Sequence, residues 1–175
     1  MELLVGIAII GIMAAIAIPG FSVWLPEYRL KGAARDLYSN YQLAKMGAIR
    51  ENRDWAVVFD TTGTGSYSIR SDDGGDNNWT DGGETIEKTV NLSDYEGSAG
   101  YGHGNATKEV PGGMTWDDHV SYTTPDNVAV FTPRGTATNL GYVYLCNNRG
   151  TAYAVGTPSI AGVVVLRKWI GSDWE

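Results

Sequence analysis

The sequence contains very little cysteine. Cys146 is the only one among 175 residues, so no disulfide can form within the chain. It ends the apolar run 143–145, a setting typical of a strand end with a buried, inert thiol. Catalysis by this thiol would need a histidine and an orienting group beside it, and the sequence indicates neither.

Motifs that carry enzyme chemistry are also missing: there is no G-x-S-x-G, no P-loop and no H-E-x-x-H. His103 and His119 stand too far apart, without cysteines, for a zinc signature, and we interpret both as ordinary surface or edge residues. The Asp-rich stretch 71–81 offers oxygen ligands suited to calcium, but its spacing is not that of an EF-hand, which favours a solvated hairpin tip. We therefore expect no enzymatic activity, no cofactor and no metal.

Basic residues are scarce: 13 Lys and Arg stand against 20 Asp and Glu, and the net charge is -7. The balance of basic and acidic residues differs between segments of the chain. Residues 27–54 carry six basic and four acidic groups, whereas residues 55–175 carry seven basic and fifteen acidic groups. Binding to a phosphate backbone depends on clustered Lys and Arg, so we expect no nucleic-acid partner.

What the chain does have is an uncharged apolar stretch, residues 3–18, preceded by Glu2 and closed by Pro19-Gly20. As a helix it would span about 24 Å, short of a bilayer core of about 30 Å, but the uncharged sequence continues to Leu25. A secretory signal peptide is disfavoured by the acidic N-terminus and the lack of a cleavage site. A membrane anchor, or a helix that packs against copies of itself, stays open. The second alternative explains Glu2, because a neighbouring subunit's N-terminal ammonium would neutralise a carboxylate that is costly in lipid.

Residues 27–51 show the period of an amphipathic helix, with Asn52 as a signal for its end. Pro19 and Pro26 interrupt the helix that would join the two segments, and Gly11 adds a weak point. The apolar stripe consists of Leu30, Ala34, Leu37, Tyr41, Ala44 and Ala48, widened by Tyr38, Leu43, Met46 and Ile49.

From Trp55 onward the period changes to two, which predicts strands. We expect them at residues 55–59, 66–70, 84–92, 120–122, 128–132, 141–145, 151–155 and 162–169, with 96–113 as a long surface loop. The predicted fold is α+β: an apolar helix over 1–26, an amphipathic helix over 27–54, and an antiparallel β domain over 55–175 on which the amphipathic half packs while the apolar half protrudes.

The N-terminus resembles that of type IV pilins and type II secretion pseudopilins, through Glu2-Leu3-Leu4, residues 7–11 and residues 14–19. That family carries its glutamate at the fifth mature position; here it is second, so we expect a leader and about three further residues to precede this one in the natural protein. The resemblance implies assembly roles for three positions. Glu2 would pair with a neighbouring subunit's amine, and Gly11 and Pro19 are the family's helix-weakening residues.

A second resemblance, to the GspH/FimT-type pilin domain, lies in Phe131 to Gly135, in residues 141–145 and in the terminal strand with Arg167. The two resemblances imply a structural subunit of a type IV pilus-like filament of identical subunits. Its partners would be the inner membrane before assembly, a prepilin peptidase and the pilus assembly machinery, and the assembled filament would be extracellular. Two alternatives stay open: a minor pseudopilin at the tip of a type II secretion pseudopilus and, less favoured, a DNA-binding minor pilin for uptake.

Overall fold

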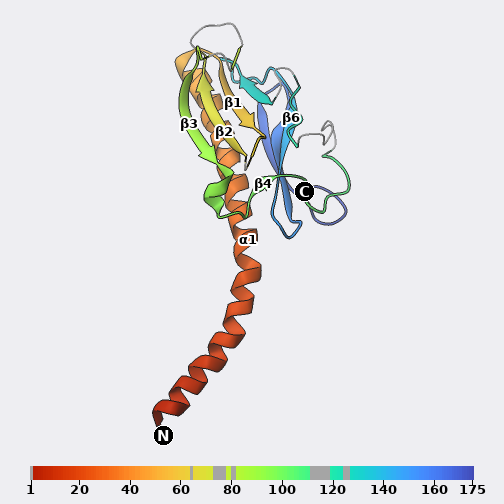
Figure 1. The fold of residues 1–175 in the computed structure, drawn as a ribbon. Helices are drawn as coiled ribbons and strands as arrows, with labels where there is room; N and C mark the ends of the chain where they lie inside the picture. Colours follow the sequence, from red (N-terminus) through yellow and green to blue (C-terminus); the bar gives the residue numbers. More distant parts are fainter. Residues whose placement is uncertain (1, 64, 73–77, 80–81, 111–118, 124–126) are drawn as a thin grey trace.

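The computed structural model describes residues 2–63, 65–72, 78–79, 82–110, 119–123 and 127–175. Its first element is one long helix, α1 (Glu2–Glu51), whose N-terminal half protrudes far from the β strands (Figure 1). Asn52 follows the helix with a left-handed φ of 53°, a conformation that asparagine adopts more readily than most residues. The predicted end of the helix is thus confirmed.

The strands form two antiparallel sheets beside the upper half of α1, so the predicted α+β architecture is confirmed. The first sheet has the order β3-β2-β1-β5 and the second β4-β6-β7-β8. A short 3-10 helix, η1 (Leu92–Tyr95), follows β3. The strands are β1 (Trp55–Asp60), β2 (Ser66–Ser71), β3 (Thr85–Asn91), β4 (Gly100–Tyr101), β5 (Val128–Phe131), β6 (Gly141–Cys146), β7 (Ala152–Ser159) and β8 (Val163–Lys168).

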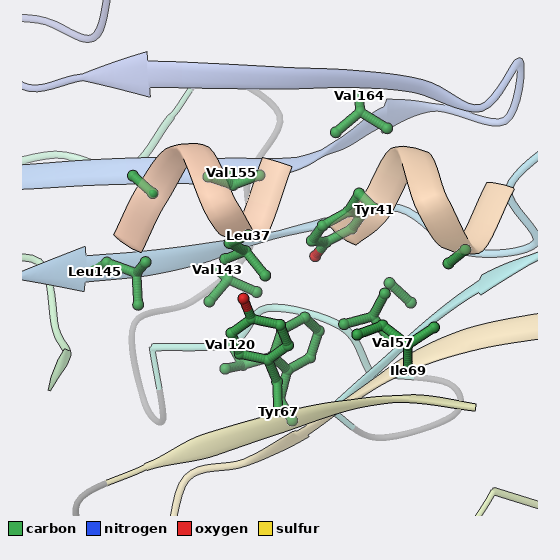
Figure 2. Packing of buried hydrophobic residues seen from close by; sticks show 14 of the residues in the cluster. Leu37, Tyr41, Val57, Tyr67, Ile69, Val120, Val143, Leu145, Val155 and Val164 are labelled. Carbon is green, nitrogen blue, oxygen red and sulfur yellow. The ribbon is translucent and has the colours of Figure 1, made fainter. Parts of the chain in front are cut away.

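The main core lies between α1 and both sheets, where Leu37 and Tyr41 of the helix meet side chains such as Val57 and Val155 (Figure 2). The predicted stripe is confirmed, because all six of its residues are completely buried: Leu30, Ala34, Leu37, Tyr41, Ala44 and Ala48.

The predicted widening of that stripe is wrong for three residues: Leu43, Met46 and Ile49 are 43%, 67% and 51% exposed. The reason is helix geometry. Met46, for example, follows the buried Ala44 by two residues, which places it on the other side of a helix with 3.6 residues per turn.

The second sheet is buried on both faces. In β6, Val143 and Leu145 belong to the main core, whereas Tyr142 and Tyr144 belong to a second cluster with the C-terminal Trp174. This arrangement follows from the alternation of side chains along a strand. It explains why β6 is apolar at nearly every position.

Residues 120–122 do not form the predicted strand; within the described residues they make a single bridge, from Val120 to Val143. His119 and Asn127, on either side, have left-handed φ values of 67° and 56°. These residues end the extended conformation before a ladder can develop. The Ser121 N–H donates to the Tyr142 carbonyl at 2.9 Å, and the Ser121 side chain bonds the backbone of the same residue as both donor and acceptor.

The predicted surface loop at 96–113 is also corrected. Gly100 and Tyr101 form β4 against β6, and Ala106 and Val110 are buried in the second cluster. Gly102 permits this close approach, because a Cβ there would lie 2.6 Å from Cys146 Sγ. Residues 111–113 lie outside the described part of the chain.

Candidate functional site

The protruding half of α1 is apolar around its whole circumference. Its large side chains are between 53% and 68% exposed: Val5, Ile7, Ile9, Ile10, Ile12 and Met13. A helix that is apolar on all sides needs an apolar environment on all sides, since burial contributes about 25 cal/mol per Å². The chain itself does not supply that environment, because this segment extends away from the sheets (Figure 1).

All three residues predicted to serve assembly lie in this half of α1. Glu2 is its first residue, and the helix continues without interruption through Gly11, Pro19 and Pro26. A Cβ added at Gly11 would meet nothing within 4 Å, so the glycine is not needed for packing within this chain. The side chains of Glu2 and Pro19 lie outside the described part, and their assembly roles stay predictions.

Ion pairs and hydrogen bonds fix the other half of α1 to the β strands. Asp36 accepts a hydrogen bond from the Tyr95 hydroxyl at 2.6 Å, and Lys45 donates one to the Gly162 carbonyl at 2.8 Å. Closer to the protruding half, Glu27 accepts a hydrogen bond from Lys168 of β8 at 2.9 Å. This bond raises the pKa of the Lys168 ammonium. The exit direction of the apolar half is therefore set by contacts distributed along the helix.

The junction between the two halves carries aromatic and basic side chains that sequence reasoning missed. The rings of Trp24 and Tyr28 stack with centroids 4.9 Å apart. They line a cleft of about 310 Å³ together with Lys31, Tyr153 and Lys168. One signal was available: Trp24 stands near the end of the uncharged stretch, and Arg29 and Lys31 follow it.

The two histidines, predicted as ordinary surface or edge residues far apart in the sequence, lie next to each other in the fold. Both are half-buried, and their ring centroids lie 5.5 Å apart. His103 Nδ1 lies 3.2 Å from the Ala106 carbonyl oxygen, which suits a protonated Nδ1 as donor. Within the described residues, no three His, Cys, Asp or Glu side chains gather in a way that could hold a metal ion. Most of the Asp-rich stretch, residues 73–77 and 80–81, lies outside the described part.

Cys146 is half-buried rather than fully buried. Burial raises the pKa of its thiol, an effect partly offset by a hydrogen bond from the backbone of Gly104. A raised pKa leaves less thiolate, the reactive form, at neutral pH. The interpretation as an inert thiol therefore has a physical basis in the structure.

Of the helical segments within the described residues, none combines the length and the apolar character needed to cross a bilayer.

Comparison with known proteins gives one match. The model of a family described as type II transport protein GspH matches residues 33–159, from the buried part of α1 to the end of β7. Neither the curated proteins nor the solved structures contain a match to this chain. The matched segment spans well over half of the chain and includes the packed helix and all strands except β8. The chain therefore belongs to the family of type II transport protein GspH.

Proposed function

We propose that the chain is a structural subunit of a type IV pilus-like filament, assembled through the apolar half of α1. The observation that carries this proposal is the exposed apolar segment from Val5 to Met13, which protrudes from a compact β structure. Parallel copies of such a helix would bury their side chains against one another. The apolar area removed from water would drive assembly at about 25 cal/mol per Å².

In this proposal the chain has three segments with different roles. Residues 1–26 anchor the precursor in the inner membrane and then form the filament core. Residues 27–54 hold the β domain on that core, and residues 55–175 cover the filament surface outside the cell. A prepilin peptidase and the assembly machinery would act on the precursor, and no catalytic step belongs to the chain itself.

A second candidate is a minor pseudopilin at the tip of a type II secretion pseudopilus, and the match to type II transport protein GspH supports its link to type II secretion. Both candidates use the same apolar helix and differ in copy number. The third, a DNA-binding minor pilin, has less support, because residues 55–175 carry fifteen acidic groups against seven basic ones.

Abundance in filaments separates the first two candidates. Surface fibres sheared from cells and examined by negative-stain microscopy and mass spectrometry should contain this chain as their main protein. If it occurs only as a trace component of fibres built from another subunit, it is a minor pseudopilin. If it occurs in no fibre, the filament proposal is wrong.

Glu2 gives the first mutational prediction. Glu2→Ala should strongly reduce filament number while the protein stays in the membrane at normal level, because the carboxylate that pairs with a neighbour's amine is lost. Asp94→Ala is the control, since Asp94 is an exposed carboxylate on the short helix η1. Filament counts and immunoblots of membrane fractions measure both effects. Normal filament number in Glu2→Ala would contradict the pairing.

A further inference from the structure

A stacked aromatic pair stands exposed where the protruding half of α1 meets the β domain. Trp24 and Tyr28 are 55% and 59% exposed, although their rings stack one helical turn apart. Large aromatic side chains are seldom left in water in this way unless another surface receives them. Tryptophan and tyrosine are enriched where an apolar environment meets a polar one, because each has an apolar ring and a polar group.

Cationic side chains surround this pair. The cleft of about 310 Å³ beside it is lined by Lys31 of α1 and Lys168 of β8. Lys168 also stands 5.9 Å from the centroid of the Tyr153 ring. Glu27 is the acidic group of the cleft, and the Lys168 ammonium, 2.9 Å away, balances its charge. Lys31, which is exposed, then leaves the cleft with a net positive charge.

The cleft continues into a second hollow on the same side of the domain. This hollow, of about 480 Å³, shares Glu27 and Lys168 with the first and is also lined by Arg149 and Ile170. Ile170 is 50% exposed. Basic groups and exposed apolar groups thus occur together around the exit of the helix, on a chain whose net charge is -7.

The position of this surface along the helix matches the thickness of a membrane. Glu2 and Trp24 are separated by about 33 Å at about 1.5 Å per residue, and the hydrocarbon core of a bilayer is about 30 Å thick. If the segment before Trp24 enters lipid, then Trp24 and Tyr28 lie at the level of the headgroups. The neighbouring lysines would lie within reach of lipid phosphates.

We propose that the foot surface, defined as Trp24, Tyr28, Lys31, Tyr153 and Lys168, binds the anionic headgroups of the bilayer and holds the subunit at the membrane before assembly. This inference rests on the proposed function, which places the precursor in a membrane. Lys31 contacts the phosphodiester, Lys168 stays paired with Glu27 beside it, and the aromatic rings lie at the glycerol level. An anionic lipid such as phosphatidylglycerol is favoured over phosphatidylcholine, because the choline ammonium would be repelled by Lys31.

The experiment uses the full chain in vesicles of phosphatidylcholine, prepared with or without phosphatidylglycerol. The vesicles also contain a lipid whose headgroup carries a nitroxide, which quenches tryptophan fluorescence nearby. Flotation with the vesicles reports insertion of the apolar half. Quenching of Trp24 fluorescence, obtained by subtracting the signal of the Trp24→Phe variant, reports contact of the foot surface with headgroups. We expect stronger quenching with phosphatidylglycerol, and a loss of the difference at high salt.

The variant Lys31→Gln tests the charge. In phosphatidylglycerol vesicles, this variant should lower the ratio of molecules with a bound foot surface to molecules with a free one about fivefold. That factor corresponds to the loss of one cation near an anionic surface. Arg134→Gln is the matched control. Arg134 is exposed and far from the foot surface: a Cβ added at the neighbouring Gly135 would lie 2.9 Å from Ile49 Cδ1, at the other end of α1. The loss of Arg134 should leave quenching unchanged.

The outcomes separate this inference from the proposed function. A chain that floats, but whose Trp24 is not quenched or is quenched equally in both lipids, overturns the foot surface and leaves the membrane-inserted subunit intact. A chain that does not float contradicts the membrane stage of the proposed function itself. If Lys31→Gln docks normally in vesicles but forms fewer filaments in cells, the surface is a contact between subunits and the inference is wrong.

Discussion

At the scale of single residues, a chain of buried hydroxyl groups links α1 to the second sheet. The Tyr41 hydroxyl donates to that of Tyr122 at 3.2 Å, and Tyr122 also accepts from the Thr157 N–H at 3.1 Å. The Tyr122 proton is then directed to Thr157 Oγ1 at 2.9 Å, and Thr157 donates to the Asn139 carbonyl at 3.3 Å. The hydroxyls of Tyr122 and Thr157 each have both a donor and an acceptor, and that of Tyr41 has an acceptor, so each of these buried polar groups is hydrogen-bonded.

This arrangement predicts unequal effects for two similar substitutions. Tyr122→Phe should lower the free energy of unfolding by about 1–3 kcal/mol, because it leaves the Tyr41 hydroxyl and the Thr157 N–H without an acceptor. Tyr41→Phe should cost less, about 0.5–1.5 kcal/mol, since Tyr122 keeps its bonds to Thr157. Denaturant unfolding of the full chain in detergent micelles measures both. Equal losses would contradict the proposed direction of the bonds.

The same residues predict a loss of stability in alkali. Burial raises the pKa of Tyr122 to about 12 and also raises that of Tyr41, whereas an unfolded tyrosine titrates near 10. Below pH 10 both states keep the protons, so this contribution to stability is complete. Above pH 10 the unfolded state loses protons that the folded state retains, so stability falls as pH rises from about 10 to 12.

The measurement for this prediction is the unfolding free energy against pH in the full chain. The slope between pH 10 and 12 should be negative, and it should become less steep in Tyr122→Phe, which removes one titrating group. A flat profile in the unmodified chain would show that these tyrosines titrate in the folded state as they do in the unfolded state.

At the scale of secondary structure, the sequence predicted elements well where the apolar residues recurred with a single period. The stripe from Leu30 to Ala48 recurs every three or four residues, and its burial follows from that spacing alone. The short strand β4 was missed because Gly100 and Tyr101 stand among glycines and polar residues that suggest a loop. Its pairing with β6 depends on a partner more than forty residues away, which local sequence does not reveal.

The helix through Gly11 and Pro19 leads to a prediction about how this segment changes in a filament. In the isolated chain α1 is continuous. In a filament we expect regular hydrogen bonding to be lost between Gly11 and Pro19, because Pro19 cannot donate to the carbonyl of Ala15 and neighbouring subunits or water can take over the freed groups. In a bilayer such unpaired groups would cost several kcal/mol each, so the helix should persist there.

A filament map at side-chain resolution tests this expectation directly. Extended backbone rises about 3.3 Å per residue against about 1.5 Å in a helix, so melting would lengthen the segment measurably. Pro19→Ala should straighten it and change the subunit rise or the fibre flexibility. Unbroken bonds from Gly11 to Ile18 in the unmodified filament would refute the prediction.

At the scale of the whole molecule, the candidate site was only partly predictable. The role of the apolar half of α1 as a contact surface could be predicted from composition, since exposing so much apolar surface to water is unfavourable. The foot surface could not be foreseen, because it joins residues of α1 to Lys168, which is held there by Glu27, a residue 141 positions away that it meets only after the second sheet packs against α1. Assembly through the helix is thus a prediction that the sequence alone can make, whereas the surface around the helix exit depends on the fold.

The proposed boundary between the apolar half of α1 and the rest of the chain leads to the last prediction. We expect the β domain to fold without the apolar half. Among the side chains of α1 that the structure describes, a fragment that begins at Glu27 keeps every buried one, and it also keeps the Glu27–Lys168 bond and both sheets. It should be soluble and unfold in one cooperative transition, as small domains do, which calorimetry and circular dichroism measure.

A shorter fragment serves as the control for that prediction. Starting at Tyr38, it lacks the buried residues Leu30, Ala33, Ala34 and Leu37, and so exposes the core surface that they cover. Loss of a single buried leucine typically costs about 2–5 kcal/mol, of the same order as the total stability of about 5–15 kcal/mol of a domain, so this fragment should be molten or insoluble. If the fragment from Glu27 behaves in the same way, residues before Glu27 contribute to the fold and the boundary between anchor and domain is wrong. If both fragments fold, the segment of α1 before Tyr38 is not needed for the core, and the buried residues from Tyr41 to Ala48 suffice to cover it.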